Sequence, residues 1–177
     1  MRVFVDSGGF LAVMDRDDPL HPVARDISAR LESSRAQLYP SNYIVDETCT
    51  LVRARASHRL AAQFLRSLRT SGIILLRVTP AIEAEAERIF LRHVDKDFSF
   101  TDCTSFALIE TKRLDAVLSF DRHFSQYRFR NGVRTGSGFD NLLLPQSGSR
   151  CLSSRPSPLA TTREGQEGVR LGCTTLP

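Results

Sequence analysis

Short apolar runs alternate with helical patterns over the first 130 or so residues of the chain. The runs RVFV, IILLRV and AVLSF are apolar at both alternating positions, which is typical of strands that are covered on both faces. Between the runs, apolar residues recur every three to four positions, which predicts helices. Strands separated by helices indicate crossover connections, so we predict an α/β fold: a three-layer α/β/α domain with a central parallel sheet. The predicted strands span residues 2–7, 36–41, 72–78 and 115–120. The predicted helices span residues 17–34, 42–56, 57–71, 79–94 and 121–127, and a further helix begins at residues 99–102.

The end of the chain has a different composition. Residues 131–177 contain seven of the ten glycines and half of the eight prolines, and no helical or strand period runs through them beyond the short FDNLLLP. Such a composition is typical of chains that cannot bury enough apolar surface to fold. We therefore predict one domain, residues 1–130, followed by a Gly/Ser/Pro-rich, mostly disordered tail, residues 131–177.

The composition agrees with a globular domain and adds limits on its surroundings. The chain is 41% hydrophobic and 25% charged, and no apolar run approaches the roughly 20 residues that span a bilayer. Its start lacks the pattern of a signal peptide. Its four cysteines show no paired spacing, which favours a reducing compartment and argues against a zinc site. We predict a cytoplasmic protein with no membrane partner; the net charge of +4 permits a polyanionic partner without requiring one.

Four acidic residues stand at positions where carboxylates could gather. Asp6 and Asp121 directly follow predicted strands, and the carboxyl ends of parallel strands meet at the edge where ligands bind. Glu47 lies among apolar helix positions, where burial is costly unless the carboxylate is paired or coordinates a metal. Asp102 opens an apolar helix, but spacing alone does not fix the course of the loop before it.

Each of these acids also has a purely structural interpretation that the residues leave open. Asp6 could be a turn residue, and Glu47 could face solvent. Asp102 could close a capping box with Ser99, and Asp121 could cap the helix that follows it.

The motifs around these acids resemble those of a known family. Four segments resemble, in order and spacing, the acidic motifs of PIN-domain ribonucleases: VFVDSGGFLAV, YIVDETCTLV, DKDFSFTDCTSFALIE and VLSFDRHF. Within that family, they resemble VapC-type toxins most closely. The likeness covers residues 1 to about 127, and SFTDCTSFAL and SFDRHF are its most specific parts. The resemblance implies that Asp6, Glu47, Asp102 and Asp121 converge as catalytic residues and metal ligands.

The implied chemistry suits such a cluster. Carboxylates in close proximity raise one another's pKa unless cations neutralise them, and oxygen ligands suit Mg²⁺ or Mn²⁺. The resemblance implies in-line hydrolysis of RNA phosphodiester bonds, leaving a 5′-phosphate and a 3′-hydroxyl.

The resemblance therefore predicts a metal-dependent endoribonuclease that acts as the toxin of a toxin–antitoxin pair. It implies three partners: RNA, a cognate antitoxin and a second copy of the chain. One alternative is a catalytically idle PIN-like module that only binds RNA or a partner. A phosphotransfer or nucleotide-binding protein is disfavoured, because DSG lacks the D-x-D pattern and no phosphate-binding glycine motif is present.

Five further residues are auxiliary candidates. Ser7 could orient Asp6 or a phosphate, Asp97 could lie at the rim of the metal pocket, and Thr101 could cap the helix that carries Asp102. Arg122 and His123 could contact RNA phosphate, although the residues themselves favour a role at the start of a surface helix for both.

Overall fold

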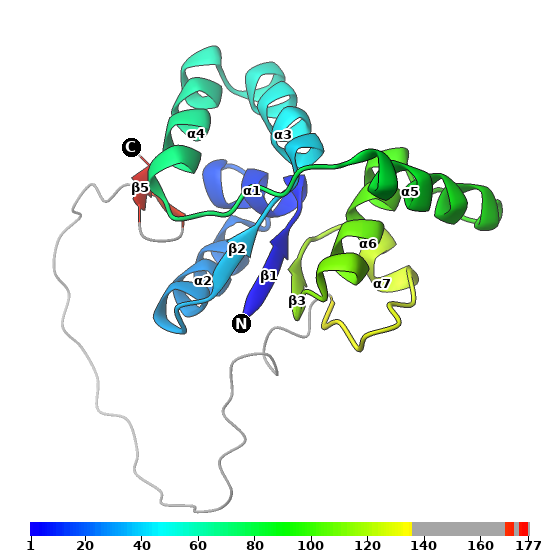
Figure 1. Cartoon of the computed structure of the whole chain (residues 1–177). Helices are drawn as coiled ribbons and strands as arrows, with labels where there is room; N and C mark the ends of the chain where they lie inside the picture. The colour runs from blue at the N-terminus through cyan, green and yellow to red at the C-terminus, as the bar shows by residue number, and fades with distance from the viewer. Residues whose placement is uncertain (136–168, 172–173, 177) are drawn as a thin grey trace, which may run out of the picture.

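A computed structural model describes residues 1–135, 169–171 and 174–176 (Figure 1). At its centre, strand β1 (Arg2–Val5) pairs in parallel with β2 (Gln37–Tyr39) on one side and with β3 (Ala116–Leu118) on the other. The strand order is β2-β1-β3, so both neighbours of β1 are reached by crossover connections. The predicted α/β class with a central parallel sheet is confirmed.

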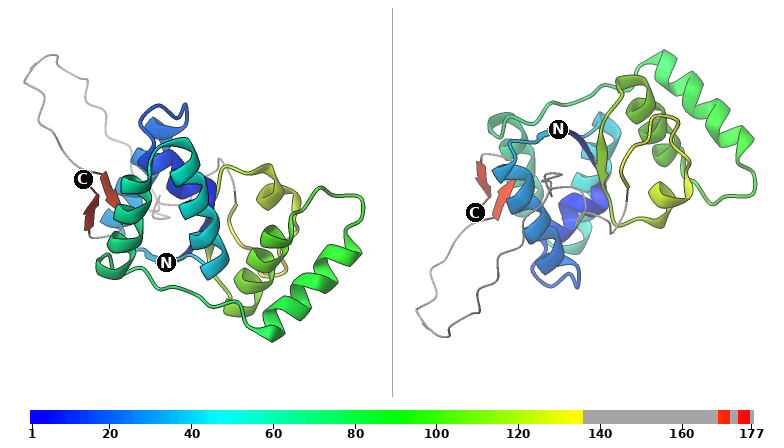
Figure 2. Two further views of the ribbon diagram at one scale, coloured as in Figure 1. Left: turned by 90° about the horizontal axis from the view of Figure 1, so that it is seen from above. Right: turned by 90° about the horizontal axis from the view of Figure 1, so that it is seen from below.

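Helices cover the sheet in two groups, one on either side of β1 (Figure 2). In the first group, α1 packs against α2 and α3, and α3 packs against α4; in the second, α5 and α7 pack against α6. The bounds are α1 Ser7–Met14, α2 His21–Ser33, α3 Asn42–Arg55, α4 His58–Thr70, α5 Pro80–Arg92, α6 Phe100–Lys112 and α7 Arg122–Gln126.

The two edges of the sheet are completed by single bridges rather than by strands. Leu76 forms a parallel bridge with Ser41, and Arg134 forms one with Ala116. The predicted strand 72–78 is therefore wrong as a regular strand. Ile74 N–H and Leu76 N–H do bond to the carbonyls of Leu38 and Pro40, but Pro40 has no N–H to return a bond to this segment, which interrupts the ladder.

Helix α1 was not among the predicted elements. Its sequence SGGFLAVM is apolar on nearly all sides, and seven of its eight residues are buried, so it shows no helical period. Gly9 explains how it packs so closely to the sheet: a Cβ at this position would lie 2.9 Å from the carbonyl oxygen of Leu118. This close approach brings the start of α1 against the end of β3.

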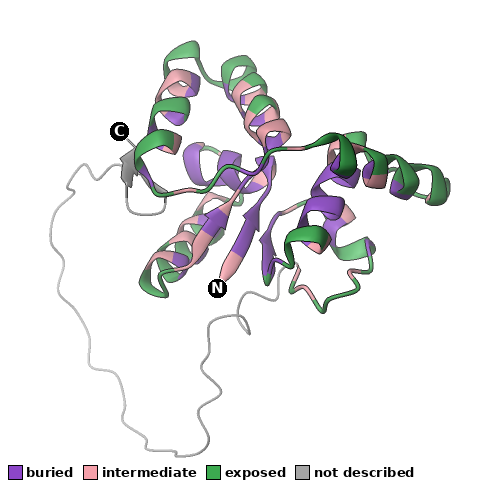
Figure 3. Ribbon diagram, viewed as in Figure 1, coloured by how far each residue is buried: buried purple, intermediate pink, exposed green. Residues whose placement is uncertain are grey.

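The core lies between the sheet and its helices (Figure 3). Its buried apolar side chains run from Val3 in β1 to Tyr127 just after α7. No helix in the described part of the chain is both long and apolar enough to cross a membrane.

Near the C-terminus, β4 (Val169–Leu171) pairs antiparallel with β5 (Thr174–Leu176). Both strands lie within residues 131–177, which were predicted as a mostly disordered tail. Residues 131–135 of that segment are also described, and its other residues lie outside the described part of the chain.

Candidate active site

Asp6 sits where β1 ends and α1 begins. It is the N-cap of α1, and its side chain accepts a hydrogen bond from the Gly8 N–H. The residue is 6% exposed, and burial raises the pKa of its carboxyl group to about 6, against the opposing effect of a hydrogen bond from Ser119. The charges of Glu47 and Asp102 raise this pKa further, which places both groups near Asp6.

Glu47 reaches the same place from the middle of α3. It is half-buried, and its pKa is raised by burial first and then by the charges of Asp102 and Asp121, while a hydrogen bond with the Ser7 side chain lowers it. The solvated-face interpretation of Glu47 therefore does not hold. Ser7, the first residue of α1 and itself buried, interacts with Glu47.

Asp102 is both a helix cap and a member of the cluster. Ser99 is the N-cap of α6, and its hydroxyl accepts from the Asp102 N–H at 3.0 Å. In return, the Ser99 N–H donates to Asp102 Oδ2 at 2.8 Å, which completes a capping box. The two interpretations of Asp102 are thus compatible: the cap fixes the direction of a side chain that is 8% exposed beside the other acids.

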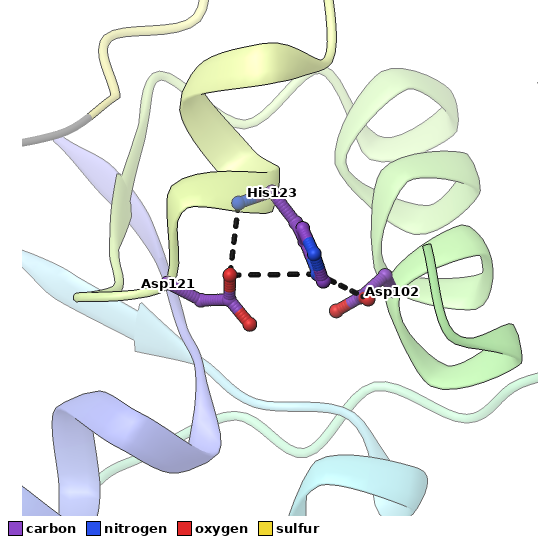
Figure 4. Close-up of side chains that lie close together, drawn as sticks. All are labelled: Asp102, Asp121 and His123. Atoms are coloured by element: carbon purple, nitrogen blue, oxygen red, sulfur yellow. Dashed lines mark hydrogen bonds and ion pairs between the residues drawn. The ribbon is translucent and has the colours of Figure 1, made fainter. Parts of the chain in front are cut away.

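Asp121 closes the cluster from the end of β3. Its Oδ1 caps α7 by accepting from the His123 N–H at 2.8 Å, and its side chain is 42% exposed. The ring of His123 points between Asp121 and Asp102 (Figure 4). Its Nδ1 lies 2.9 Å from Asp102 Oδ2 and 3.4 Å from Asp121 Oδ1.

Ser119 is a site residue that the sequence interpretation missed. It is buried at the end of β3; its hydroxyl donates to Asp6 Oδ2 at 2.9 Å and accepts from the Asp121 N–H at 3.0 Å. It therefore ties the two strand-end aspartates together. The only available signal was its position two residues before Asp121 in VLSFD.

Among the auxiliary candidates, Thr101 is the second residue of α6, so the prediction that it caps this helix is wrong and Ser99 has that role. Asp97 and Arg122 form an ion pair with each other at 3.5 Å, and their side chains are 87% and 70% exposed. This pair stands in solvent, and the RNA contact predicted for Arg122 stays a prediction.

The four acids thus converge from four separate elements at the carboxyl edge of the sheet. Two of them, Asp6 and Glu47, carry raised pKa values, first because both are removed from water and second because the charges of the other acids lie nearby. Oxygen donors in this number suit a hard divalent cation.

Comparison with known proteins identifies the family of this chain. Residues 3–130 match the PIN domain, a span that contains all four acids. The chain belongs to the PIN-domain family. It is 32% identical over 128 residues to the 23S rRNA-specific endonuclease VapC20 of Mycobacterium tuberculosis, covering 72% of this chain and 95% of that protein. It is 30% identical over 129 residues to a VapC ribonuclease of Archaeoglobus fulgidus, covering 71% of this chain and 80% of the relative.

The structural comparison agrees. The crystal structure of Mycobacterium tuberculosis VapC20, described as a sarcin–ricin loop cleaving toxin, superimposes with a TM-score of 0.63 at 31% identity. The match covers 73% of this chain and 97% of VapC20. The predicted resemblance to VapC-type PIN domains is confirmed.

Proposed function

We propose that this PIN-domain protein is a divalent-metal-dependent endoribonuclease of the VapC type and acts as the toxin of a toxin–antitoxin pair. The observation that carries the proposal is the convergence of Asp6, Glu47, Asp102 and Asp121 from four elements on one edge of the sheet. The named activities of the VapC relatives support it.

The chain's own residues prepare the site for a cation. Asp6 is oriented by Ser119 and by the start of α1, and Asp102 is oriented by the capping box, so neither carboxylate must be ordered when an ion binds. Glu47 and Asp121, which lie close enough for their charges to act on each other, supply further oxygens. Mg²⁺ or Mn²⁺ bound there would polarise the scissile phosphate and supply an acidified water for in-line attack.

The partners follow from the same assignment. We propose an RNA substrate, a cognate antitoxin and a second copy of the chain. Apolar side chains at the end of α5 and the start of α6 are exposed, as expected where another chain docks: Phe90, Leu91, Val94 and Phe100.

Cleavage of the sarcin–ricin loop of 23S rRNA is the first reaction to test, because a relative's structure is described by it. With Mg²⁺ or Mn²⁺, the wild-type chain, freed of any bound antitoxin, should cut this RNA. Asp6→Asn and Asp102→Asn should lower the rate by at least about 100-fold, beyond the about 10- to 100-fold typical of residues that only support a ligand.

Asp17→Asn is the matched control, since Asp17 is exposed in the loop between α1 and α2 and the substitution removes one negative charge from a residue outside the acidic cluster. It should cut at the wild-type rate. Equal cleavage rates for the wild type and all three variants would contradict the assignment of Asp6 and Asp102 as metal ligands. No cleavage of this or total cellular RNA by the wild type would favour the idle binding module.

A further inference from the structure

The side chain of His123 is largely buried, unlike that of a surface residue that contacts RNA. Its side chain is 16% exposed, and Nδ1 faces two carboxylates rather than solvent (Figure 4). Nδ1, an oxygen of Asp102 and an oxygen of Asp121 all lie within 4.8 Å of one another.

The imidazole is held in this position by its surroundings. Its ring packs edge-on against Phe98, with centroids 5.5 Å apart, and Phe98 is itself buried against Phe106. The His123 backbone N–H is fixed by Asp121 Oδ1. The ring therefore meets the two acids with little rotamer freedom left to lose.

The spacing suits coordination as well as hydrogen bonding. Around a six-coordinate ion with ligands at about 2.1 Å, adjacent ligand atoms are about 3 Å apart. His123 Nδ1 and Asp102 Oδ2 are 2.9 Å apart, and Nδ1 and Asp121 Oδ1 are 3.4 Å apart. A small movement would place all three on one ion.

We propose that His123 is a nitrogen ligand of the metal site, alongside Asp102 and Asp121, and that it biases the site toward Mn²⁺ over Mg²⁺. The proposal rests on the metal dependence proposed above. Its chemical basis is that Mg²⁺ binds oxygen ligands in near-ideal octahedral geometry, whereas Mn²⁺, which also binds carboxylates and water, is a first-row transition ion that takes nitrogen ligands as well.

Pulsed electron paramagnetic resonance of bound Mn²⁺ tests this directly. The untagged wild-type chain should show ¹⁴N coupling from a coordinated imidazole, and selective ¹⁵N labelling of histidine should change the pattern. His123→Gln should lose the coupling. His58→Gln is the matched control, because His58 is exposed at the start of α4, and it should keep the coupling.

Calorimetric titration gives a second readout. His123→Gln should weaken Mn²⁺ binding by about 10-fold or more and Mg²⁺ binding by less than about 3-fold. Absence of Mn²⁺ binding or of ¹⁴N coupling in the wild type overturns the proposal, and so does equal weakening for both ions. In the latter case His123 only donates a hydrogen bond to Asp102.

The wild-type spectrum decides the matter even if the variant folds poorly. It also separates this inference from the nuclease assignment. Nitrogen-coupled Mn²⁺ without RNA cleavage would remove the proposed function and keep the ligand, whereas cleavage without nitrogen coupling would do the reverse.

Discussion

Asp6 places a carboxylate at a position that is 6% exposed, and burial raises its pKa from 3.8 to about 6. The folded state therefore holds its proton up to a higher pH than the unfolded state does. Between these two values the unfolded chain binds fewer protons at this group, so stability falls as pH rises from about 4 to 6 and stays lower above that. The buried, ionised carboxylate of Asp6 therefore lowers the free energy of unfolding of the metal-free protein.

Replacing Asp6 with Asn should remove this cost, since an amide can still accept from Ser119 and cap α1. In EDTA at pH 7.5, Asp6→Asn should be more stable to denaturant than the wild type by about 1–3 kcal/mol, and the gain should vanish near pH 4. Asp17→Asn, which removes an exposed charge, should show no such pH-dependent gain. A less stable Asp6→Asn at pH 7.5 would mean that the charged form is favoured in the fold.

At this scale, the sequence predicted which acids lie together better than it predicted which groups hold them in place. Asp6 and Asp121 follow strands, so the topology alone brings them to one edge. Ser119 and the orientation of His123 depend on side-chain directions across elements far apart in the chain, and no local spacing encodes these. Asp102 was placed only by its resemblance to a family motif.

The capping box at the start of α6 links the stability of an element to the geometry of the site. Ser99→Ala removes the hydroxyl that accepts from the Asp102 N–H. It should lower stability by about 1 kcal/mol and cleavage by about 10-fold, because an oriented ligand is loosened.

Ser57→Ala is the control for that variant, since Ser57 caps α4 in the same way, at 3.2 Å from the Leu60 N–H, and no active-site residue lies on α4. Denaturation should show equal losses of stability for the two variants. RNA cleavage should be slower for Ser99→Ala alone. Equal rates for both variants would restrict the Ser99 cap to a structural role.

Most elements before residue 136 could be predicted from periodicity, and the two exceptions among them have physical causes. Helix α1 is buried nearly all round, so the polar face that reveals a helix is missing. The segment 72–78 has the composition of a strand, but pairing depends on its neighbour, where Pro40 offers no donor.

For the whole molecule, the parts needed for the site lie before residue 136. The PIN match ends at residue 130. Among the residues whose burial is described, the last in the core is Tyr127, whose ring stacks on Phe106 with centroids 4.2 Å apart. Arg134 adds one bridge to Ala116 at the edge of the sheet. We therefore propose that the domain folds without residues 136–177, although β4 and β5 contact α1, α2 and α4.

A chain ending at residue 135 should keep the circular dichroism of the full chain, an unfolding free energy within about 1 kcal/mol of it, and a similar rate of RNA cleavage. A chain ending at residue 126 is the matched control, because it loses Tyr127 and the Arg134 bridge. It should be less stable than the full chain by at least about 3–5 kcal/mol, the cost of removing a stacked, buried aromatic side chain, which is a large part of a total of about 5–15 kcal/mol. Loss of structure in the longer chain as well would place residues 136–177 inside the folding unit and move the domain boundary toward the C-terminus.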